Sequence, residues 1–557
     1  MLKLEKLTLQ KALPQSCDKF GDHPAMSLIG QKAFSYTELK AKVDTFSAAL
    51  LKWGIKKGDK IAIISENSPL WGMAYMAIGQ IGATNAPVLT DFHKNEVHHI
   101  IRSSEARIAL TSKKFAHKLE NGKLGNLELI ITLDDAEIVN EAIKTQKLSD
   151  FLAENTSEVD PKKFPEVDEE DLLEILFTSG TTGHSKGVML TNKNIISNAL
   201  EVLEAIDIGT SDRLLSILPL AHVYECTCGM IAPLLGGANI TYIVGLPTAQ
   251  TLMPAMAKIN PTIVLSVPLV MEKIYKKRVV SEVNGKPVLK ALYKIPPIRK
   301  ALNKIIGKKL YQAFGGALRF IVFGGAATPP EVENFLKEGK FPYISGYGLT
   351  ETSPLLTVNP PEKVKVGSCG KPVRDVELRI DDINPQSGAG EILARGPMIM
   401  KGYYKNPEAT AEVMLEGGWF KTGDLGYLDD EGYLHISGRS KNVIVGPSGE
   451  NIFPELIEHV IGENPFVLES LVYQYEGKLV ARVFLDYDAV DAQFETQKMT
   501  ETEAKKKIQD LLEQIRRETN NSVASFSRIT KIIEQQEEFE KTPTKKIKRF
   551  LYYDKQI

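Results

Sequence analysis

The sequence contains few cysteines, which argues against a small fold held together by disulfide bonds or by a structural zinc ion. The spacing of the four cysteines suits neither a disulfide framework nor a zinc site. The pair Cys226 and Cys228 lacks the spacing of a Cys-x-x-Cys motif, and we expect both side chains to be buried and to serve only packing. We therefore expect a protein of a reducing compartment. The other two cysteines are Cys17 and Cys369.

The chain also lacks a long uninterrupted apolar run and a strong excess of either charge. Residues 226–257 contain no charged side chain, but several glycines and prolines interrupt them, which predicts short buried elements rather than a membrane span. Met1–Lys6 show no apolar signal-peptide core, so we expect a cytoplasmic protein. A net charge of −2 gives no general attraction to nucleic acid. We expect no nucleic-acid partner.

The length and the patterning predict several α/β units. At 557 residues, with 43% hydrophobic and 25% charged residues, the chain is too long for one compact core. Between about residues 35 and 150, helical patterns alternate with short apolar strands, as in layered α/β domains with largely parallel sheets. From about Gly367 the pattern changes to short glycine-rich strands, and from about Ser440 to a separate α+β unit. That last unit includes a helix over 504–517 with a capping box from Thr500 to Glu503.

The segment Thr178–Val188 carries the strongest chemical signal. It reads Thr-Ser-Gly-Thr-Thr-Gly-His-Ser-Lys-Gly-Val. Glycines let backbone N–H groups approach an anion closely, and hydroxyls and a lysine add further donors, so the segment predicts a phosphate-binding loop. The alternative is an ordinary flexible surface loop. The candidate binding residues are Thr178, Ser179, Gly180, Thr181, Thr182, Gly183 and Lys186.

This loop differs from a Walker A motif. A glycine follows Lys186 where that motif has serine or threonine, and the flanks predict a strand over 172–177 and another over 188–190. A helix then begins with Asn192 or Asn194 as its expected cap. A strand–loop–strand phosphate site argues against kinase-like and GTPase-like folds.

Thr178–Val188 resembles the phosphate loop of the adenylate-forming superfamily, which includes acyl-CoA synthetases, luciferases and nonribosomal peptide synthetase adenylation domains. The resemblance implies a large N-terminal domain, residues 1–438, of layered α/β subdomains with a small β-rich subdomain. A mobile α+β C-terminal domain, residues 439–557, is expected to follow, with a hinge near Lys441. The overall fold class is α/β.

Three further motifs match the nucleotide site of that superfamily. Gly324, Gly325 and Ala326 form a glycine turn of the kind that lies against adenine. In Gly346-Tyr-Gly-Leu-Thr-Glu-Thr352, Tyr347 offers an aromatic face to adenine, Thr350 a hydroxyl to the α-phosphate and Glu351 a carboxylate oxygen for Mg²⁺. Gly346 and Gly348 complete the binding segment. In the third motif, the two oxygens of Asp424 suit the ribose hydroxyls, and Arg439 resembles the family's ribose- and phosphate-contacting arginine.

A lysine near the C-terminus completes the resemblance. Thr542, Thr544, Lys546, Ile547 and Arg549 fit the family pattern Thr-x-Ser-Gly-Lys-Ile-x-Arg, in which the lysine bridges the acyl carboxylate and the α-phosphate. Lys545 stands where glycine is usual, so two adjacent lysines are candidates. Lys546 is preferred because it keeps the Lys-Ile spacing.

His222 is open to two interpretations. It lies in the apolar run Leu218-Pro-Leu-Ala-His-Val-Tyr224 and could be a hydrogen-bonded core residue. By resemblance, the same position borders the acyl pocket and is linked to the CoA half-reaction. We therefore include His222 among the candidate catalytic residues, with Lys546, Thr350 and Glu351.

The segments Leu218–Glu225, Gly438–Ile444 and Gly449–Pro454, and the basic insertion after Val267–Ile274, match bacterial long-chain fatty acid–CoA ligases, which the whole chain resembles. This implies activation of a fatty acid by ATP and Mg²⁺ to an acyl-adenylate, transfer to CoA, and release of AMP and pyrophosphate. The alternatives are an acyl carrier protein as acceptor, another carboxylic acid as substrate, or a nucleotide-binding protein without catalysis. The basic stretch Lys273–Lys309 is either a solvated helix face or a surface that contacts anionic lipid or an acidic carrier.

Overall fold

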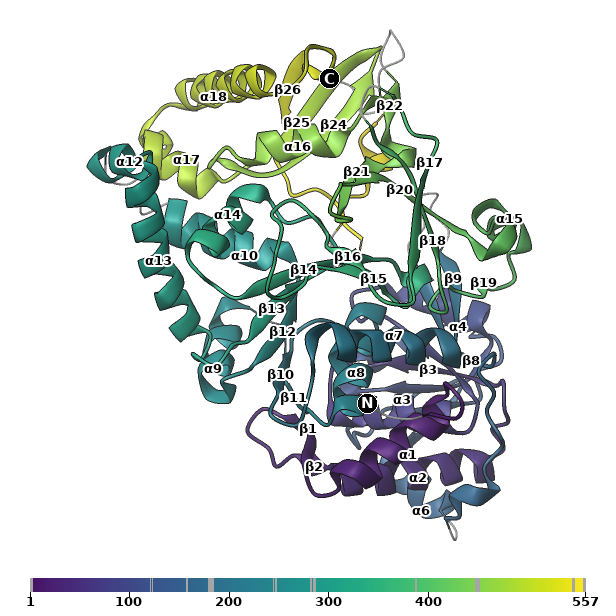
Figure 1. Cartoon of the computed structure of the whole chain (residues 1–557). Coiled ribbons are helices and arrows are strands. Elements are labelled where there is room, and N and C mark those ends of the chain that lie inside the picture. Colours follow the sequence, from purple (N-terminus) through teal and green to yellow (C-terminus); the bar gives the residue numbers. More distant parts are fainter. Residues whose placement is uncertain are drawn as a thin grey trace.

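The computed structural model shows a large body of sheets and helices with a smaller α+β unit resting on it (Figure 1). The N-terminus lies in the large body and the C-terminus in the smaller unit. The structure describes residues 4–120, 122, 124–156, 159–178, 185–243, 245, 248–280, 283, 287–385, 388–445, 451–542 and 546–553.

The first of two large sheets has eight strands in the order β19-β9-β8-β4-β3-β5-β6-β7. Its central strands are parallel and buried almost throughout, because helices cover the sheet. The strands are β3 (Lys60–Ile64), β4 (Thr84–Pro87), β5 (Ala106–Thr111), β6 (Leu129–Thr132), β7 (Lys144–Lys147), β8 (Leu172–Thr178), β9 (Lys186–Thr191) and β19 (Gly402–Tyr403). The helices of this half are α1 (Leu9–Phe20), α2 (Tyr36–Trp53), α3 (Pro69–Gln80), α4 (Lys94–Ser104), α5 (Lys113–Ala116) and α6 (Leu148–Asn155).

The second large sheet has nine strands in the order β16-β15-β14-β13-β12-β10-β11-β1-β2. Six neighbouring strands, from β14 to β1, run parallel. The strands are β1 (Pro24–Leu28), β2 (Phe34–Ser35), β10 (Arg213–Ser216), β11 (Asn239–Tyr242), β12 (Ile263–Ser266), β13 (Phe320–Phe323), β14 (Tyr343–Gly348), β15 (Leu355–Val358) and β16 (Lys371–Pro372). Its helices are α7 (Asn192–Ile206), α8 (Ala232–Gly236), α9 (Ala249–Ile259), α10 (Pro268–Tyr275), α12 (Pro287–Tyr293), α13 (Pro296–Ala313) and α14 (Pro330–Glu338).

The uncharged segment 226–257 is core over residues 226–243, as predicted, but exposes Gln250, Thr251 and Ala257. It forms most of a π-helix, η3 (Tyr224–Ile231), then α8, β11 and the first part of α9. Cys226 and Cys228 are buried free thiols. In the described part of the chain, no helix combines the length and the apolar character that a membrane crossing needs.

A four-stranded antiparallel sheet forms the small β-rich subdomain. Its order is β17-β18-β20-β21, and α15 (Pro407–Val413) lies between its second and third strands in sequence. The strands are β17 (Glu377–Asp381), β18 (Gly390–Arg395), β20 (Phe420–Leu428) and β21 (Leu434–Arg439).

The C-terminal unit packs a three-stranded sheet, β24-β25-β26, against helices and has its own hydrophobic core between Ile452 and Ile529. The predicted capping box is present: Thr500 and Glu503 cap α18 reciprocally. The elements are β22 (Ile444–Val445), β23 (Asn451–Ile452), α16 (Pro454–Gly462), β24 (Val467–Tyr475), β25 (Lys478–Leu485), α17 (Tyr487–Phe494), α18 (Glu501–Ser522) and β26 (Lys531–Glu534). The boundary between residues 438 and 439 stays a prediction, and β21 extends one residue beyond it.

One local prediction was wrong. The cap of α7 is Thr191, whose side chain accepts from the N–H of Asn194, while the Asn194 side chain accepts from the N–H of Thr191. The side chain of Asn192 instead accepts from the N–H of Leu9, and so links α1 to this helix.

Candidate active site

The predicted phosphate loop joins two antiparallel strands. β8 and β9 pair from Leu172 opposite Thr191 to Thr178 opposite Lys186, which confirms the strand–loop–strand arrangement. Thr178 and Lys186 therefore lie at the base of the loop. Ser179, Gly180, Thr181, Thr182 and Gly183 lie outside the described residues.

Lys186 connects to Glu351 through a tyrosine that sequence reasoning missed. The Nζ of Lys186 lies 4.8 Å from the centre of the Tyr403 ring, and the Tyr403 hydroxyl donates to Oε1 of Glu351 at 2.9 Å. Burial, reinforced by Glu351, raises the pKa of Tyr403, so the hydroxyl stays a donor at neutral pH. Tyr403 reaches this place because β19 pairs with β9 beside the loop. A two-residue strand has no periodicity from which this pairing could be predicted.

Asp424, Arg439 and Tyr347 form a hydrogen-bonded group. Asp424 in β20 lies directly opposite Arg439 in β21, and Arg439 Nε is 2.9 Å from Asp424 Oδ1. The other carboxylate oxygen accepts from the Tyr347 hydroxyl at 2.7 Å. Asp424 is 4% exposed, and burial raises its pKa although Arg439, Tyr347 and Lys546 act in the opposite direction. The group fixes the Tyr347 ring beside the carboxylate predicted to hold ribose.

The two glycine-containing segments lie at the ends of neighbouring parallel strands. Phe323 at the end of β13 lies opposite Ser345 in β14, so Gly324–Ala326 begin beside Gly346–Gly348, which form the last part of β14 and pair there with β15. Ligand sites in parallel sheets commonly form at such carboxyl ends of strands. Ala326 is exposed.

Close packing explains the glycines. A Cβ on Gly348 would lie 1.7 Å from the carbonyl oxygen of Pro354, and one on Gly346 would lie 2.9 Å from that of Thr357. A Cβ on Gly324 would lie 2.9 Å from the Tyr224 ring. The tight β14–β15 turn places Thr350 and Glu351 in a short 3₁₀ helix, Thr350–Thr352, directly after Tyr347 and Gly348.

The C-terminal segment brings Lys546 to this site. Lys541 and Ile547 form an isolated antiparallel bridge, the N–H of Thr542 donates to the carbonyl of Lys546 at 2.7 Å, and the N–H of Lys546 donates to Thr542 Oγ1 at 3.2 Å. Lys545 and Thr544 lie outside the described residues.

The electrostatic neighbours of Lys546 come from three other segments. Lys546 keeps solvent access, yet the surrounding protein and then Arg439 lower its pKa, while Asp424 and Glu351 raise it. Lys546 thus faces the residues predicted to bind ribose and Mg²⁺, although it lies more than a hundred residues away in sequence. Its bridging role stays a prediction.

His222 is neutral at pH 7 and lies within the electrostatic range of Lys546. Burial, and then the charge of Lys546, lower the His222 pKa to about 4. Its Nδ1 accepts from the N–H of Tyr224 at 3.2 Å, which leaves the ring proton on Nε2. The Tyr224 hydroxyl donates to the carbonyl of Val322 at 3.0 Å. His222 is half-buried, and its hydrogen bond with the Tyr224 backbone fits the interpretation as a hydrogen-bonded core residue. Its place at the acyl pocket and its role in the CoA half-reaction stay predictions.

Lys441 is exposed in a short 3₁₀ helix, Ser440–Asn442, between β21 and the C-terminal unit. The Ser440 hydroxyl donates to the carbonyl of Gly423 at 3.1 Å, and the Asn442 amide donates to Glu455 at 2.6 Å. The segment is thus attached on one side to the β-rich subdomain and on the other to α16. A hinge at Lys441 fits this position and stays a prediction.

Comparison with known proteins decides the family. The family model described as AMP-binding enzyme matches residues 13–404. The chain belongs to the AMP-binding enzyme family. Asp424, Arg439 and Lys546 lie beyond the matched range, so their place in the site rests on the geometry above.

Relatives of this AMP-binding enzyme differ in the acid they name. Fatty acyl-CoA synthetase A of Dictyostelium discoideum is 29% identical over 493 residues, which cover 83% of this chain and 73% of the relative. Oxalate–CoA ligase of Arabidopsis thaliana is 30% identical over 477 residues, which cover 84% of this chain and 85% of the relative. The crystal structure of the anthranilate CoA ligase AuaEII in complex with anthranoyl-AMP matches with a TM-score of 0.78 at 21% identity, covering 99% of this chain and 97% of that one.

The AMP-binding enzyme is an adenylate-forming CoA ligase with the fold of its superfamily. Enzymes of this class use ATP and CoA. The donor set fits a magnesium–nucleotide complex: Tyr403 uses one oxygen of Glu351, and a carboxylate offers a second oxygen of the hard type that Mg²⁺ prefers. Glu351 would hold the ion, which would supply positive charge to the phosphates of the bound nucleotide.

Proposed function

We propose that this AMP-binding enzyme activates a long-chain fatty acid with ATP and transfers the acyl group to CoA. The acid's carboxylate attacks the α-phosphate, the bond to the β-phosphate breaks, and pyrophosphate leaves. The CoA thiol then attacks the carbonyl of the acyl-adenylate and expels AMP. The proposal rests above all on the position of Lys546 within electrostatic range of Asp424, Arg439 and Glu351.

Each group has a task that its position supports. The loop based on Thr178 and Lys186 would hold the departing phosphates, and Thr350 and Lys546 would stabilise the negative charge on the phosphate that is attacked. Such donors accelerate a reaction when they are fixed before the charge develops. The bonded Asp424–Tyr347 pair provides this fixation for ribose and adenine.

The long-chain assignment is the finer part of the proposal. It is supported by the name of the Dictyostelium relative and by residues 226–242 of η3, α8 and β11, which are mostly buried, carry no acidic or basic side chain, follow His222 and could line an apolar acyl site. An apolar wall favours a long alkyl chain by roughly 0.8 kcal/mol for each CH₂ that it removes from water. Oxalate has no CH₂ group, so an apolar wall would add no binding energy for it.

Two half-reaction assays on oxalate and on a panel of acids from acetate to oleate test the proposal. Pyrophosphate release without thiol reports adenylation, and AMP release on addition of CoA or acyl carrier protein reports transfer. We expect both signals to be largest with long chains and with CoA. A maximum at acetate or oxalate would reject the chain length, a preference for the carrier protein would reject the acceptor, and no pyrophosphate with any acid would reject catalysis.

We further propose that α12 and α13, which contain most of the second half of the basic stretch Lys273–Lys309, contact anionic lipid. Leu289, Tyr293 and Ile306 pack inward, but Val288, Leu292, Ile295 and Ile305 are exposed among the lysines of the same two helices. Figure 1 places both helices at an outer edge of the large body. Apolar side chains surrounded by lysine are typical of surfaces that lie in a membrane interface.

Vesicle flotation tests this surface. Ile305→Ser should weaken binding to vesicles of anionic phospholipid. Ile383→Ser is the matched control, because Ile383 is exposed to the same 56% but lies beside the β-rich sheet. Equal loss in both variants, or equal binding of the parent protein to neutral vesicles, would contradict the proposal.

A further inference from the structure

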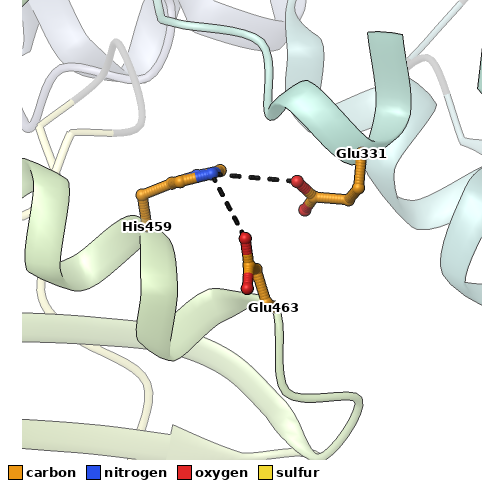
Figure 2. Close-up of side chains that lie close together, drawn as sticks. All are labelled: Glu331, His459 and Glu463. Atoms are coloured by element: carbon orange, nitrogen blue, oxygen red, sulfur yellow. Dashed lines mark ion pairs between the residues drawn. The ribbon is translucent and has the colours of Figure 1, made fainter. Parts of the chain in front are cut away.

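A second group of side chains joins the large body to the C-terminal unit away from Lys546. Glu331 lies in the first turn of α14, and His459 and Glu463 lie at the end of α16 (Figure 2). Ligand atoms of the three residues lie within 4.8 Å of one another. The two residues of α16 are four positions apart, so they face the same side of the helix.

The distances are too long for hydrogen bonds but suit a shared ion. His459 Nε2 is 3.8 Å from Glu331 Oε2 and 3.8 Å from Glu463 Oε1. Tetrahedral Zn²⁺ with bonds of 2.0–2.1 Å places its ligand atoms roughly 3.3 Å apart. A small inward movement of each side chain would therefore complete three corners of such a site, with water at the fourth.

A separate observation also points to a ligand. Oε2 of Glu331, the oxygen that faces His459, is buried and accepts no hydrogen bond from any described residue. A buried carboxylate oxygen without a donor is costly, and a metal ion would remove that cost.

The surroundings are mainly acidic. The residues that line the pocket between the two units include Glu272, Glu331, Glu458 and Glu469, and also Lys276. Lys276 donates to the carbonyl of Val467 at 2.9 Å, and so makes its own contact across the interface. Glu458 is paired with Arg549 and Glu469 with Lys541, so Glu272 and Glu331 are the carboxylates of this lining that would attract a cation. The imidazole favours a transition metal over Mg²⁺.

We propose that Glu331, His459 and Glu463 bind a divalent transition-metal ion, best Zn²⁺, that links the large body to the C-terminal unit. The bound ion would hold the arrangement in which Lys546 faces Asp424 and Glu351. Binding itself is independent of the proposed reaction, so failure of one leaves the other standing.

Metal titration of the full-length protein without nucleotide tests the site. Calorimetry with Zn²⁺ and visible absorption with Co²⁺ should show one equivalent bound, with the intense absorption of a tetrahedral site. Glu331→Gln and Glu463→Gln should each weaken that equivalent at least tenfold. Glu362→Gln, at an exposed carboxylate elsewhere on the large body, is the control and should bind like the parent.

Thermal unfolding separates a lost ligand from a lost fold. We expect the glutamine variants to unfold at the parent's temperature without metal and to lose the upward shift that Zn²⁺ gives the parent. No Zn²⁺ bound by the parent, unchanged affinity in both glutamine variants, or displacement of Zn²⁺ by equal Mg²⁺ would overturn the proposal.

Discussion

Replacement of Lys546 by alanine should separate the two half-reactions. The Lys546 ammonium lies within electrostatic range of Asp424, Glu351 and Arg439, and the surrounding protein makes its charge act strongly. Removal of one such fixed donor typically slows the step it serves by about 10²–10³-fold, or roughly 3–4 kcal/mol. We therefore expect Lys546→Ala to reduce pyrophosphate release by this factor.

The controls are provided by the chain itself. Lys545→Gly restores the usual family residue and should adenylate at the parent rate, because we assign the charge to Lys546. Acyl-adenylate supplied from outside should react with CoA at nearly the parent rate in Lys546→Ala. A full adenylation rate in Lys546→Ala, or a comparable loss in Lys545→Gly, would refute the assignment.

The pH dependence gives a second test of the same residue. The surrounding protein and Arg439 lower the pKa of Lys546 below that of a free lysine, about 10.4. The protonated form is the active one, so the adenylation rate should fall as the pH rises, and the fall should begin below the range of an ordinary lysine. Lys546→Arg should lack this alkaline fall, because arginine keeps its proton. An unchanged alkaline limb in Lys546→Arg would assign the limb to another group.

Three further predictions follow from the geometry. Asp424→Asn loses charge-assisted bonds worth about 1.5–3 kcal/mol each, so AMP should bind at least tenfold more weakly by calorimetry, and unchanged affinity would contradict the ribose assignment. Gly348→Ala forces a Cβ to within 1.7 Å of the Pro354 carbonyl and should lower both the unfolding temperature and adenylation, whereas Gly209→Ala, with open space around its Cβ, should do neither. His222 has a folded-state pKa of about 4, below its unfolded value near 6.5. The unfolded chain therefore binds the extra proton, and the free energy of unfolding falls as the pH drops from 6.5 to 4. In His222→Gln this loss should be smaller, by at most about 3 kcal/mol, as measured by denaturant unfolding.

Local patterns predicted much of the chain because they reflect short-range physics. The helix cap at Thr500, the strands on either side of the phosphate loop and the buried character of residues 226–243 all depend on neighbours in sequence. The cap of α7 was misjudged by one position or more, since serine, threonine and asparagine accept similar hydrogen bonds and three of them stand together at the helix start.

Partners distant in sequence could not be derived from local patterns. Tyr403 reaches Glu351 only because a two-residue strand pairs beside the phosphate loop. The bond between Tyr347 and Asp424 likewise depends on how the β-rich sheet packs against β14. The pair Glu331 and His459 exists only where two folded units meet.

The sequence by itself determined the chemistry of this enzyme, because phosphate loops and nucleotide motifs depend on residue types at fixed short spacing. The match over residues 13–404 confirmed the family. Only the tertiary structure decided which side chains act together. It brought Lys546 within electrostatic range of Asp424 and Glu351 and placed His459 beside Glu331, because packing of the C-terminal unit on the large body sets these positions.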